Sequence, residues 1–146
     1  MTTSRERSPS THHQDITWYE VGILCQRLVD RVLTSCSDIK VVAGIKRGGV
    51  IPGTIIAHLL GTNFRPVADQ YDLMDFDPRK VLLIDDVCDT GETLAKFIVK
   101  GGPSNQFHTA VLLAKPWILD KERKHIFVLD YIAEWTEDWV VFPWEK

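Results

Sequence analysis

Two adjacent carboxylates follow the most apolar run of the sequence and precede a turn rich in hydroxyl groups. Val81–Ile84 is entirely aliphatic, Asp85 and Asp86 come next, and Asp89–Thr93 reads Asp-Thr-Gly-Glu-Thr. Hydroxyls, and backbone N–H groups that Gly91 leaves accessible, suit a phosphate. The carboxylates would repel a phosphate and need hydroxyl groups or a metal ion as partners. The segment indicates a ligand with both vicinal hydroxyls and a phosphate, such as a ribose 5′-phosphate. The alternative is a pair of polar strand-end residues that cap a helix.

The pattern of apolar residues predicts the elements that position this segment. Thr17 and Glu20 have the spacing of a capping box, which starts a helix that ends near residues 35–37. We expect strands at 41–45, 64–67, 81–84, 109–113 and 126–131, and helices at 52–60 and around 94–99. This alternation predicts one α/β domain, a mostly parallel sheet flanked by helices. Ligands of such sheets bind beyond the carboxyl ends of the strands, where Asp85 and Asp86 lie.

The bulk properties predict a single soluble domain. The chain has 146 residues, of which 1–16 are expected to form a flexible tail and 17–146 the folded domain. No apolar run approaches the ~20 residues of a membrane helix, so no membrane partner is expected. The three cysteines show no CxxC and no paired spacing, which favours a reducing, cytoplasmic location. The formal net charge of −3 makes nucleic acid an unlikely main ligand.

Residues Val81–Thr93 resemble the phosphoribosyl pyrophosphate signature of type I phosphoribosyltransferases: four apolar residues, two acids and a Thr-Gly-x-Thr turn. The resemblance implies the type I phosphoribosyltransferase fold with a small C-terminal hood. It implies that Asp85 and Asp86 bind the ribose hydroxyls and help to hold Mg²⁺, and that Asp89–Thr93 wraps the 5′-phosphate. In purine-using relatives the residue equivalent to Asp89 lies near the base nitrogens and is discussed as a proton acceptor.

A second resemblance lies in the loop Lys46–Gly49, which is similar to the pyrophosphate loop of this family. It implies that the loop amides and the Arg47 guanidinium stabilise the charge on departing pyrophosphate, and that the Lys46–Arg47 peptide bond is cis. Taken alone, this loop would be a glycine turn with two solvated cations. The implied phosphoribosyl pyrophosphate-binding residues are Lys46, Arg47, Gly48, Gly49, Asp85, Asp86, Val87, Cys88, Asp89, Thr90, Gly91, Glu92 and Thr93, with Asp89 and Arg47 catalytic and Asp85 and Asp86 as metal ligands.

A third resemblance covers the end of the chain. Lys115 follows a predicted strand, and Glu137–Glu145 is similar to the base-binding hood of bacterial xanthine-guanine phosphoribosyltransferases. It implies that Lys115 donates to the exocyclic oxygen of a 6-oxopurine, that Trp139 stacks on the base, and that Val140 backbone groups read its edge. The alternative is that the aromatic residues fill a small core and Lys115 is solvated. Trp117, Trp135 and Trp144 are expected in packing or at interfaces.

The resemblances together imply an enzyme, a glycosyltransferase that joins xanthine, guanine or hypoxanthine to phosphoribosyl pyrophosphate. Its products would be a nucleoside monophosphate and pyrophosphate, and its cofactor would be Mg²⁺. The protein would form a homo-oligomer, as in the family. The alternative is a non-catalytic, nucleotide-binding regulator with the same fold. One feature departs from the family pattern: residues 69–79, where relatives carry a long mobile loop, are short and acidic. Tyr71 and its neighbours would then form a minimal lid, a partner subunit would cover the site, or transferase activity would be weak or lost.

Overall fold

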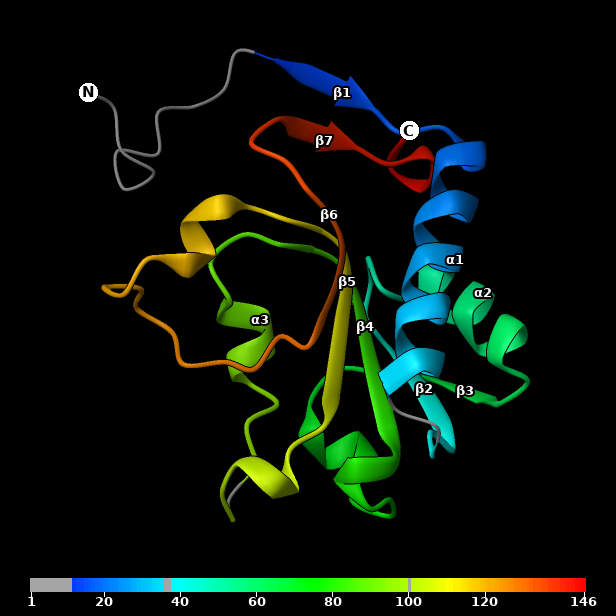
Figure 1. The fold of residues 1–146 in the computed structure, drawn as a ribbon, viewed down its shortest axis with the longest axis vertical. Coiled ribbons are helices and arrows are strands. Elements are labelled where there is room, and N and C mark those ends of the chain that lie inside the picture. Colours follow the sequence, from blue (N-terminus) through cyan, green and yellow to red (C-terminus); the bar gives the residue numbers. More distant parts are fainter. Residues whose placement is uncertain (1–11, 36–37, 100) are drawn as a thin grey trace.

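A five-stranded parallel sheet forms the centre of the fold, as a computed structural model of residues 12–35, 38–99 and 101–146 shows (Figure 1). Its strand order is β3-β2-β4-β5-β6, and every neighbouring pair is parallel. Helices α1 and α2 cover one face, and α3 lies on the other. The predicted α/β fold is confirmed. The bounds are α1 Trp18–Ser35, β2 Val41–Ile45, α2 Val50–Leu60, β3 Asn63–Val67, β4 Val81–Cys88, α3 Glu92–Ala95, β5 His108–Ala114 and β6 Tyr131–Trp135.

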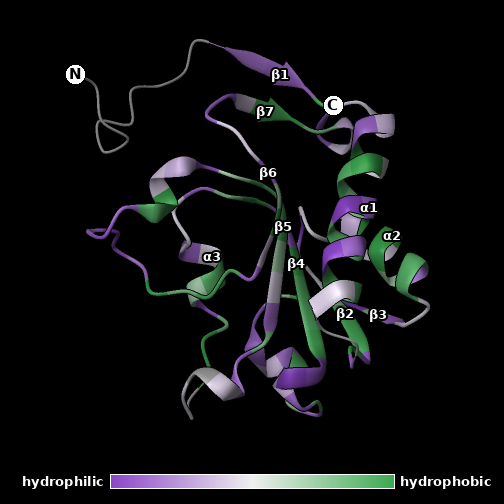
Figure 2. Cartoon of the chain, in the orientation of Figure 1, coloured by the Kyte–Doolittle hydropathy of each residue, from purple (hydrophilic) through white to green (hydrophobic). Residues whose placement is uncertain are grey.

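The central strand β4 is buried on both faces. Leu82 and Ile84 pack with α1 and α2, whereas Val81 and Leu83 belong to a second core on the α3 side. Apolar colouring follows β4 upward from the base of the sheet in Figure 2. Because successive side chains of a strand point to opposite faces, a shift of one residue would exchange the two cores. Packing on both faces therefore fixes the register of the residues that follow.

The signals for the start of α1 and the end of α2 were interpreted correctly. The Thr17 backbone N–H donates to the Glu20 carboxylate, and the Glu20 N–H donates to the Thr17 hydroxyl, each over 3.1 Å. Helix α2 starts at Val50, two residues before the predicted Pro52, and Gly61 ends it with φ of 71°. Among the helices that the structure describes, none combines the length and apolarity needed to cross a membrane.

The last sheet strand was predicted wrongly at 126–131, since β6 starts at Tyr131. Side-chain bonds replace a strand ladder before that point. The Thr109 hydroxyl donates to the Val128 carbonyl over 2.7 Å, and the Asp130 carboxylate accepts from the Thr109 N–H over 3.0 Å. Apolar composition alone could not distinguish this side-chain-bonded segment from a strand.

The helix predicted around 94–99 is also wrong in extent, because α3 covers only Glu92–Ala95. The chain continues in tighter turns, with the Phe97 N–H donating to the Leu94 carbonyl over 3.0 Å. The backbone of Val99 is then bonded to the Gln106 side chain: the Val99 N–H donates to the Gln106 amide oxygen over 2.8 Å. Phe97 and Phe107 are both buried, and their rings pack edge to face with centroids 6.3 Å apart.

Part of the predicted tail is folded. Residues 1–11 lie outside the described residues, but strand β1 (His13–Asp15) pairs in parallel with β7 (Trp139–Val141). The Ile16 N–H donates to the Val141 carbonyl over 2.9 Å, and the Ile16 side chain is only 3% exposed. This two-stranded sheet lies beyond the carboxyl ends of β4 and β5 (Figure 1). The segment before α1 therefore supports the C-terminal hood.

We predict that Ile16→Ala lowers the free energy of unfolding by about 2–5 kcal/mol, because it removes a buried side chain that anchors β1. Thermal or urea unfolding measures the change. The matched control is Ile126→Ala, since Ile126 is 80% exposed and its truncation should change stability by less than about 0.5 kcal/mol. Equal effects of the two substitutions would contradict the anchoring role.

Candidate functional site

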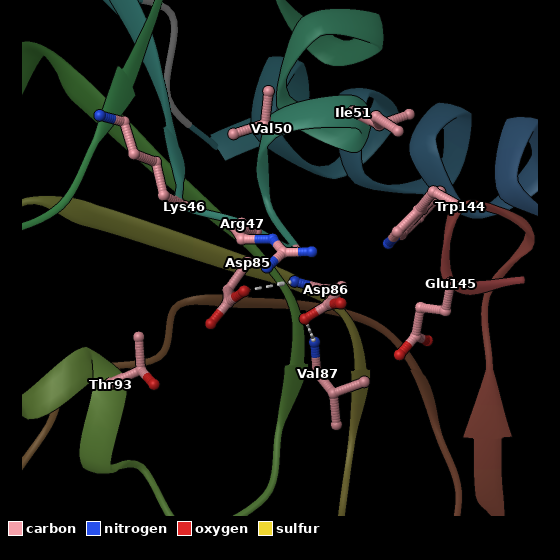
Figure 3. Close-up of a pocket in the computed structure, with 11 residues that line it drawn as sticks. Lys46, Arg47, Val50, Ile51, Asp85, Asp86, Val87, Thr93, Trp144 and Glu145 are labelled. Atoms are coloured by element: carbon pink, nitrogen blue, oxygen red, sulfur yellow. Dashed lines mark hydrogen bonds between the residues drawn. The ribbon is translucent and has the colours of Figure 1, made fainter.

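A pocket of about 850 Å³ opens where β2 and β4 end (Figure 3). Its walls come from the loop after β2, the carboxyl end of β4 and a turn at the C-terminus. The lining residues are Lys46, Arg47, Gly48, Val50, Ile51, Asp85, Asp86, Val87, Thr93, Trp144 and Glu145. The two loops that the sequence singled out thus meet at the expected edge of the sheet.

Asp85 and Asp86 are the two acidic residues of β4, and their side chains point to opposite sides of the strand. Asp85 lies on the side of Thr93, and Asp86 on the side of Glu145 (Figure 3). The Asp85 carboxylate accepts from the Asp86 N–H over 2.8 Å, and that of Asp86 from the Val87 N–H over 2.7 Å. Strand geometry thus presents one carboxylate to each half of the site.

The environment of this pair disfavours negative charge. Burial, with the neighbouring Asp86 carboxylate, raises the pKa of Asp85 to about 8. Burial also raises the pKa of Asp86, and the carboxylate of Glu145 acts in the same direction. Two desolvated carboxylates at one strand end are stabilised by a cation or by hydroxyl donors.

The carboxylate pair has the chemistry of a Mg²⁺ site completed by substrate. Mg²⁺ prefers oxygen ligands and is commonly held by one or two carboxylates together with substrate phosphates and water. Among the described residues, no three His, Cys, Asp or Glu side chains group closely enough to hold a metal by themselves. The residues present therefore fit a metal that arrives with an oxygen-rich ligand.

The loop after β2 approaches Asp86 closely. A Cβ on Gly48 would lie 2.3 Å from an Asp86 carboxylate oxygen, so a larger residue would displace that carboxylate. The Lys46–Arg47 peptide bond is cis, as predicted. Two of the loop amides that the resemblance assigns to pyrophosphate are bonded within the protein. The Lys46 N–H donates to the Val67 carbonyl and the Gly49 N–H to the Ile45 carbonyl, each over 2.8 Å, since the tight turn uses them internally.

A second hollow of about 110 Å³ lies beside the pocket, within residues 85–94. Gly91 has φ of 82°, and a Cβ there would lie 2.1 Å from the Phe127 ring, so the turn requires glycine. The helix that follows, α3, has a single turn, so its dipole would contribute little to the binding of an anion. The hollow is lined by Asp85, Val87, Cys88, Asp89, Thr90, Gly91, Glu92, Thr93 and Leu94. Val87 and Cys88 prove to be strand residues, paired with β5.

Lys115 lies at the end of β5 and is 8% exposed. Its ammonium group donates to the carbonyl of Asp138 in the hood. Burial lowers the pKa of Lys115, while the charge of Asp89 acts in the opposite direction. The interpretation of Lys115 as a solvated cation is wrong. A buried ammonium beside Asp89, with further N–H donors beyond its bond to Asp138, suits a carbonyl oxygen of a ligand.

The two predicted base-binding residues of the hood, Trp139 and Val140, lie on β7. Trp139 is 70% exposed at the start of β7, its N–H donates to the His12 carbonyl over 3.1 Å, and Val140 pairs with Gln14 of β1. Neither residue lines the pocket, and Lys115 does not line it either.

Sequence reasoning missed Trp144 and Glu145 as pocket residues. The Trp144 ring stacks on Phe142 with centroids 4.7 Å apart, and its buried N–H has no hydrogen-bond partner among the described residues. The Glu145 carboxylate accepts from the Phe142 N–H over 2.8 Å. Pro143 after an apolar strand signalled a turn here, but not that the turn folds back to the pocket.

Comparison with known proteins agrees with this geometry. The family described as "Phosphoribosyl transferase domain" matches residues 22–146. A xanthine-guanine phosphoribosyltransferase of Chromohalobacter salexigens is 31% identical over 92% of this chain and 86% of its own length. The chain belongs to the phosphoribosyltransferase family. A second xanthine-guanine phosphoribosyltransferase, from Gluconobacter oxydans, is 26% identical over 98% of this chain and 90% of its own.

Solved structures place this phosphoribosyltransferase in the same fold. A purine phosphoribosyltransferase from Pyrococcus horikoshii superposes with a TM-score of 0.70 at 28% identity, covering 92% of this chain and 94% of its own. A xanthine-guanine-hypoxanthine phosphoribosyltransferase from Helicobacter pylori gives the same TM-score at 18% identity, covering 92% of this chain and 94% of its own. The type I phosphoribosyltransferase fold is therefore confirmed, and the chain is an enzyme of the glycosyltransferase class.

The short segment 69–79 of this phosphoribosyltransferase is part of the crossover from β3 to β4. Leu73 is buried in the α3-side core, and Arg65 lies over the Phe76 ring at 4.6 Å. Asp69 accepts from the Tyr71 N–H over 2.9 Å, so this acid stabilises a turn. No residue of 69–79 lines the pocket in the described chain.

We predict that Asp85→Asn stabilises the metal-free protein by about 1–3 kcal/mol, because the amide keeps the bond to the Asp86 N–H without a buried charge. The raised pKa means that the wild type loses stability as pH rises from about 4 to about 8. The difference between the two proteins should therefore be small at pH 4 and grow toward pH 8.

Thermal unfolding in EDTA at several pH values measures this difference, with the exposed Asp75→Asn as the control that should change little. A variant less stable than wild type at pH 8 would contradict the electrostatic account of the pair.

Proposed function

We propose that this phosphoribosyltransferase joins a 6-oxopurine base (xanthine, guanine or hypoxanthine) to phosphoribosyl pyrophosphate. The observation that carries the proposal is the buried Lys115 ammonium next to Asp89. A cationic donor pairs with the carbonyl oxygen of a 6-oxopurine and not with the amino group of adenine. The names of the two bacterial relatives, both xanthine-guanine phosphoribosyltransferases, support the same class of base.

The reaction forms a bond between a base nitrogen and the anomeric carbon of the ribose. The bond from that carbon to the pyrophosphate oxygen breaks, and pyrophosphate leaves with the electron pair. The proton lost by the base nitrogen passes to the Asp89 carboxylate, which lies at the turn after β4. The products are a nucleoside monophosphate and pyrophosphate.

The remaining residues stabilise charge on either side of the breaking bond. Asp85 and Asp86 would bind the ribose hydroxyls and hold Mg²⁺, whose charge supplies stabilisation of the pyrophosphate oxygens. Arg47 lines the same pocket and would bind the leaving pyrophosphate. Thr90 and Thr93, with the backbone around Gly91, would hold the 5′-phosphate in the smaller hollow. Trp139 and Val140, from the adjacent hood, would stack on the base and read its edge.

We predict nucleotide formation from phosphoribosyl pyrophosphate and Mg²⁺ with at least one of xanthine, guanine and hypoxanthine, and none with adenine, uracil or orotate. Lys115→Ala should lower kcat/KM for the 6-oxopurine about 10–100-fold, the loss expected for a charged hydrogen bond. The matched control is Lys121→Ala, at an exposed position in the loop after β5, which should retain activity.

Absence of product with every base would overturn the transferase assignment. If the protein then still bound nucleotide, the non-catalytic regulator would be the remaining explanation of the site. Comparable loss of activity in both lysine variants would remove Lys115 from base recognition.

A further inference from the structure

The carboxylate of Asp89 is held by an aromatic side chain from the neighbouring strand. The indole N–H of Trp117 donates to Asp89 Oδ1 over 2.6 Å. Asp89 follows the carboxyl end of β4, and Trp117 follows the carboxyl end of β5, 28 residues later. The two strands are paired in parallel up to Cys88 and Ala114, so their ends bring these side chains together.

The backbone that carries Trp117 is fixed on both sides. The Lys115 N–H donates to the Cys88 carbonyl over 3.0 Å, which extends the pairing with β4 by one residue. Pro116 then starts a single helical turn, Pro116–Leu119, in which the Ile118 N–H donates to the Lys115 carbonyl over 3.1 Å. Ile118 is 5% exposed and anchors the turn in the α3-side core. The donor is therefore presented from a rigid support, whereas Asp89 lies exposed in a turn.

The same indole ring lies against the second residue assigned to the base. The Lys115 ammonium nitrogen is 5.6 Å from the Trp117 ring centroid, within the range of a cation–π contact. One side chain thus contacts both the proposed proton acceptor and the proposed donor to the exocyclic oxygen. Trp117 therefore does more than fill space: its N–H is hydrogen-bonded, and its ring contacts a charged group.

We infer that Trp117 is a positioning residue that sets the orientation of the Asp89 carboxylate toward the base. The inference rests on the proposed function for its consequence, although the contact itself exists without substrate. With Oδ1 bound to the indole, rotation of the carboxylate is restricted and Oδ2 is the oxygen that accepts the proton from the base nitrogen. Fixing a catalytic group before substrate arrives removes an entropic cost from the reaction.

The contact is tested first by a measurement that needs no activity. In ¹⁵N-labelled protein the indole N–H signal of Trp117, assigned by its disappearance in Trp117→Phe, should shift strongly in Asp89→Ala. The indole signal of Trp18, on α1 outside this contact, should stay in place. An unchanged Trp117 signal in Asp89→Ala would overturn the inference whether or not the protein is a transferase.

The consequence is tested by kinetics with the base that the wild type uses. Trp117→Phe removes the donor but keeps a ring beneath Lys115, so kcat should fall about tenfold with KM for the base nearly unchanged. Trp117→Ala removes the ring as well and should in addition raise KM for the base. Tyr131→Phe is the matched control, since it removes one aromatic hydroxyl, bonded to the Ser35 hydroxyl over 2.7 Å, at the start of β6 and away from the carboxyl ends of the strands.

A double-mutant cycle separates positioning from general destabilisation. In the Asp89→Ala background, Trp117→Phe should have little further effect on the residual rate, because there is no carboxylate left to orient. A full tenfold loss in that background, or wild-type kcat in Trp117→Phe alone, would overturn the inference. Wild-type protein that is inactive with every base would instead reject the proposed function and leave the spectroscopic result standing.

Discussion

Burial of β4 on both faces is the constraint on which the site depends. Four consecutive aliphatic residues, Val81–Ile84, divide between two cores and allow only one register. That register delivers Asp85 to the side of Thr93 and Asp86 to the side of the C-terminal turn. A slip of one residue would bury carboxylates in the cores and remove them from the pocket. The chemistry at the strand end is thus positioned by packing well away from it.

The same arrangement leaves the site electrostatically incomplete. Two desolvated carboxylates stand next to each other with Glu145 nearby, so their negative charge is unfavourable in the protein alone. A ligand that carries hydroxyl groups and brings a divalent cation relieves this cost, because each partner neutralises or hydrogen-bonds a carboxylate. Under the proposed function, the stability that the fold loses here would favour binding of a metal-bound ribose phosphate. On this account, affinity and stability are opposed at the same two residues.

Local pattern was enough to predict the sheet, the two main helices and the loops that meet at the pocket. It failed where side chains remote in sequence decide the backbone. The bond between Thr109 and Asp130 lies where the last strand was expected, and Gln106 bonds the backbone of Val99 after α3. Local pattern also did not reveal that the turn at Trp144 and Glu145 reaches the pocket. The contact between Trp117 and Asp89 joins positions 28 residues apart, and no spacing rule relates them. Such contacts depend on strand pairing, which a single sequence does not reveal.

The account is tested most directly by calorimetric titration of phosphoribosyl pyrophosphate into the protein, with Mg²⁺ and with EDTA. The account predicts saturable binding with Mg²⁺ that is lost in EDTA. It also predicts that Asp86→Asn weakens this binding without unfolding the protein. Equal affinity with and without the metal, or unchanged affinity in the Asp86→Asn variant, would contradict the role assigned to the carboxylate pair.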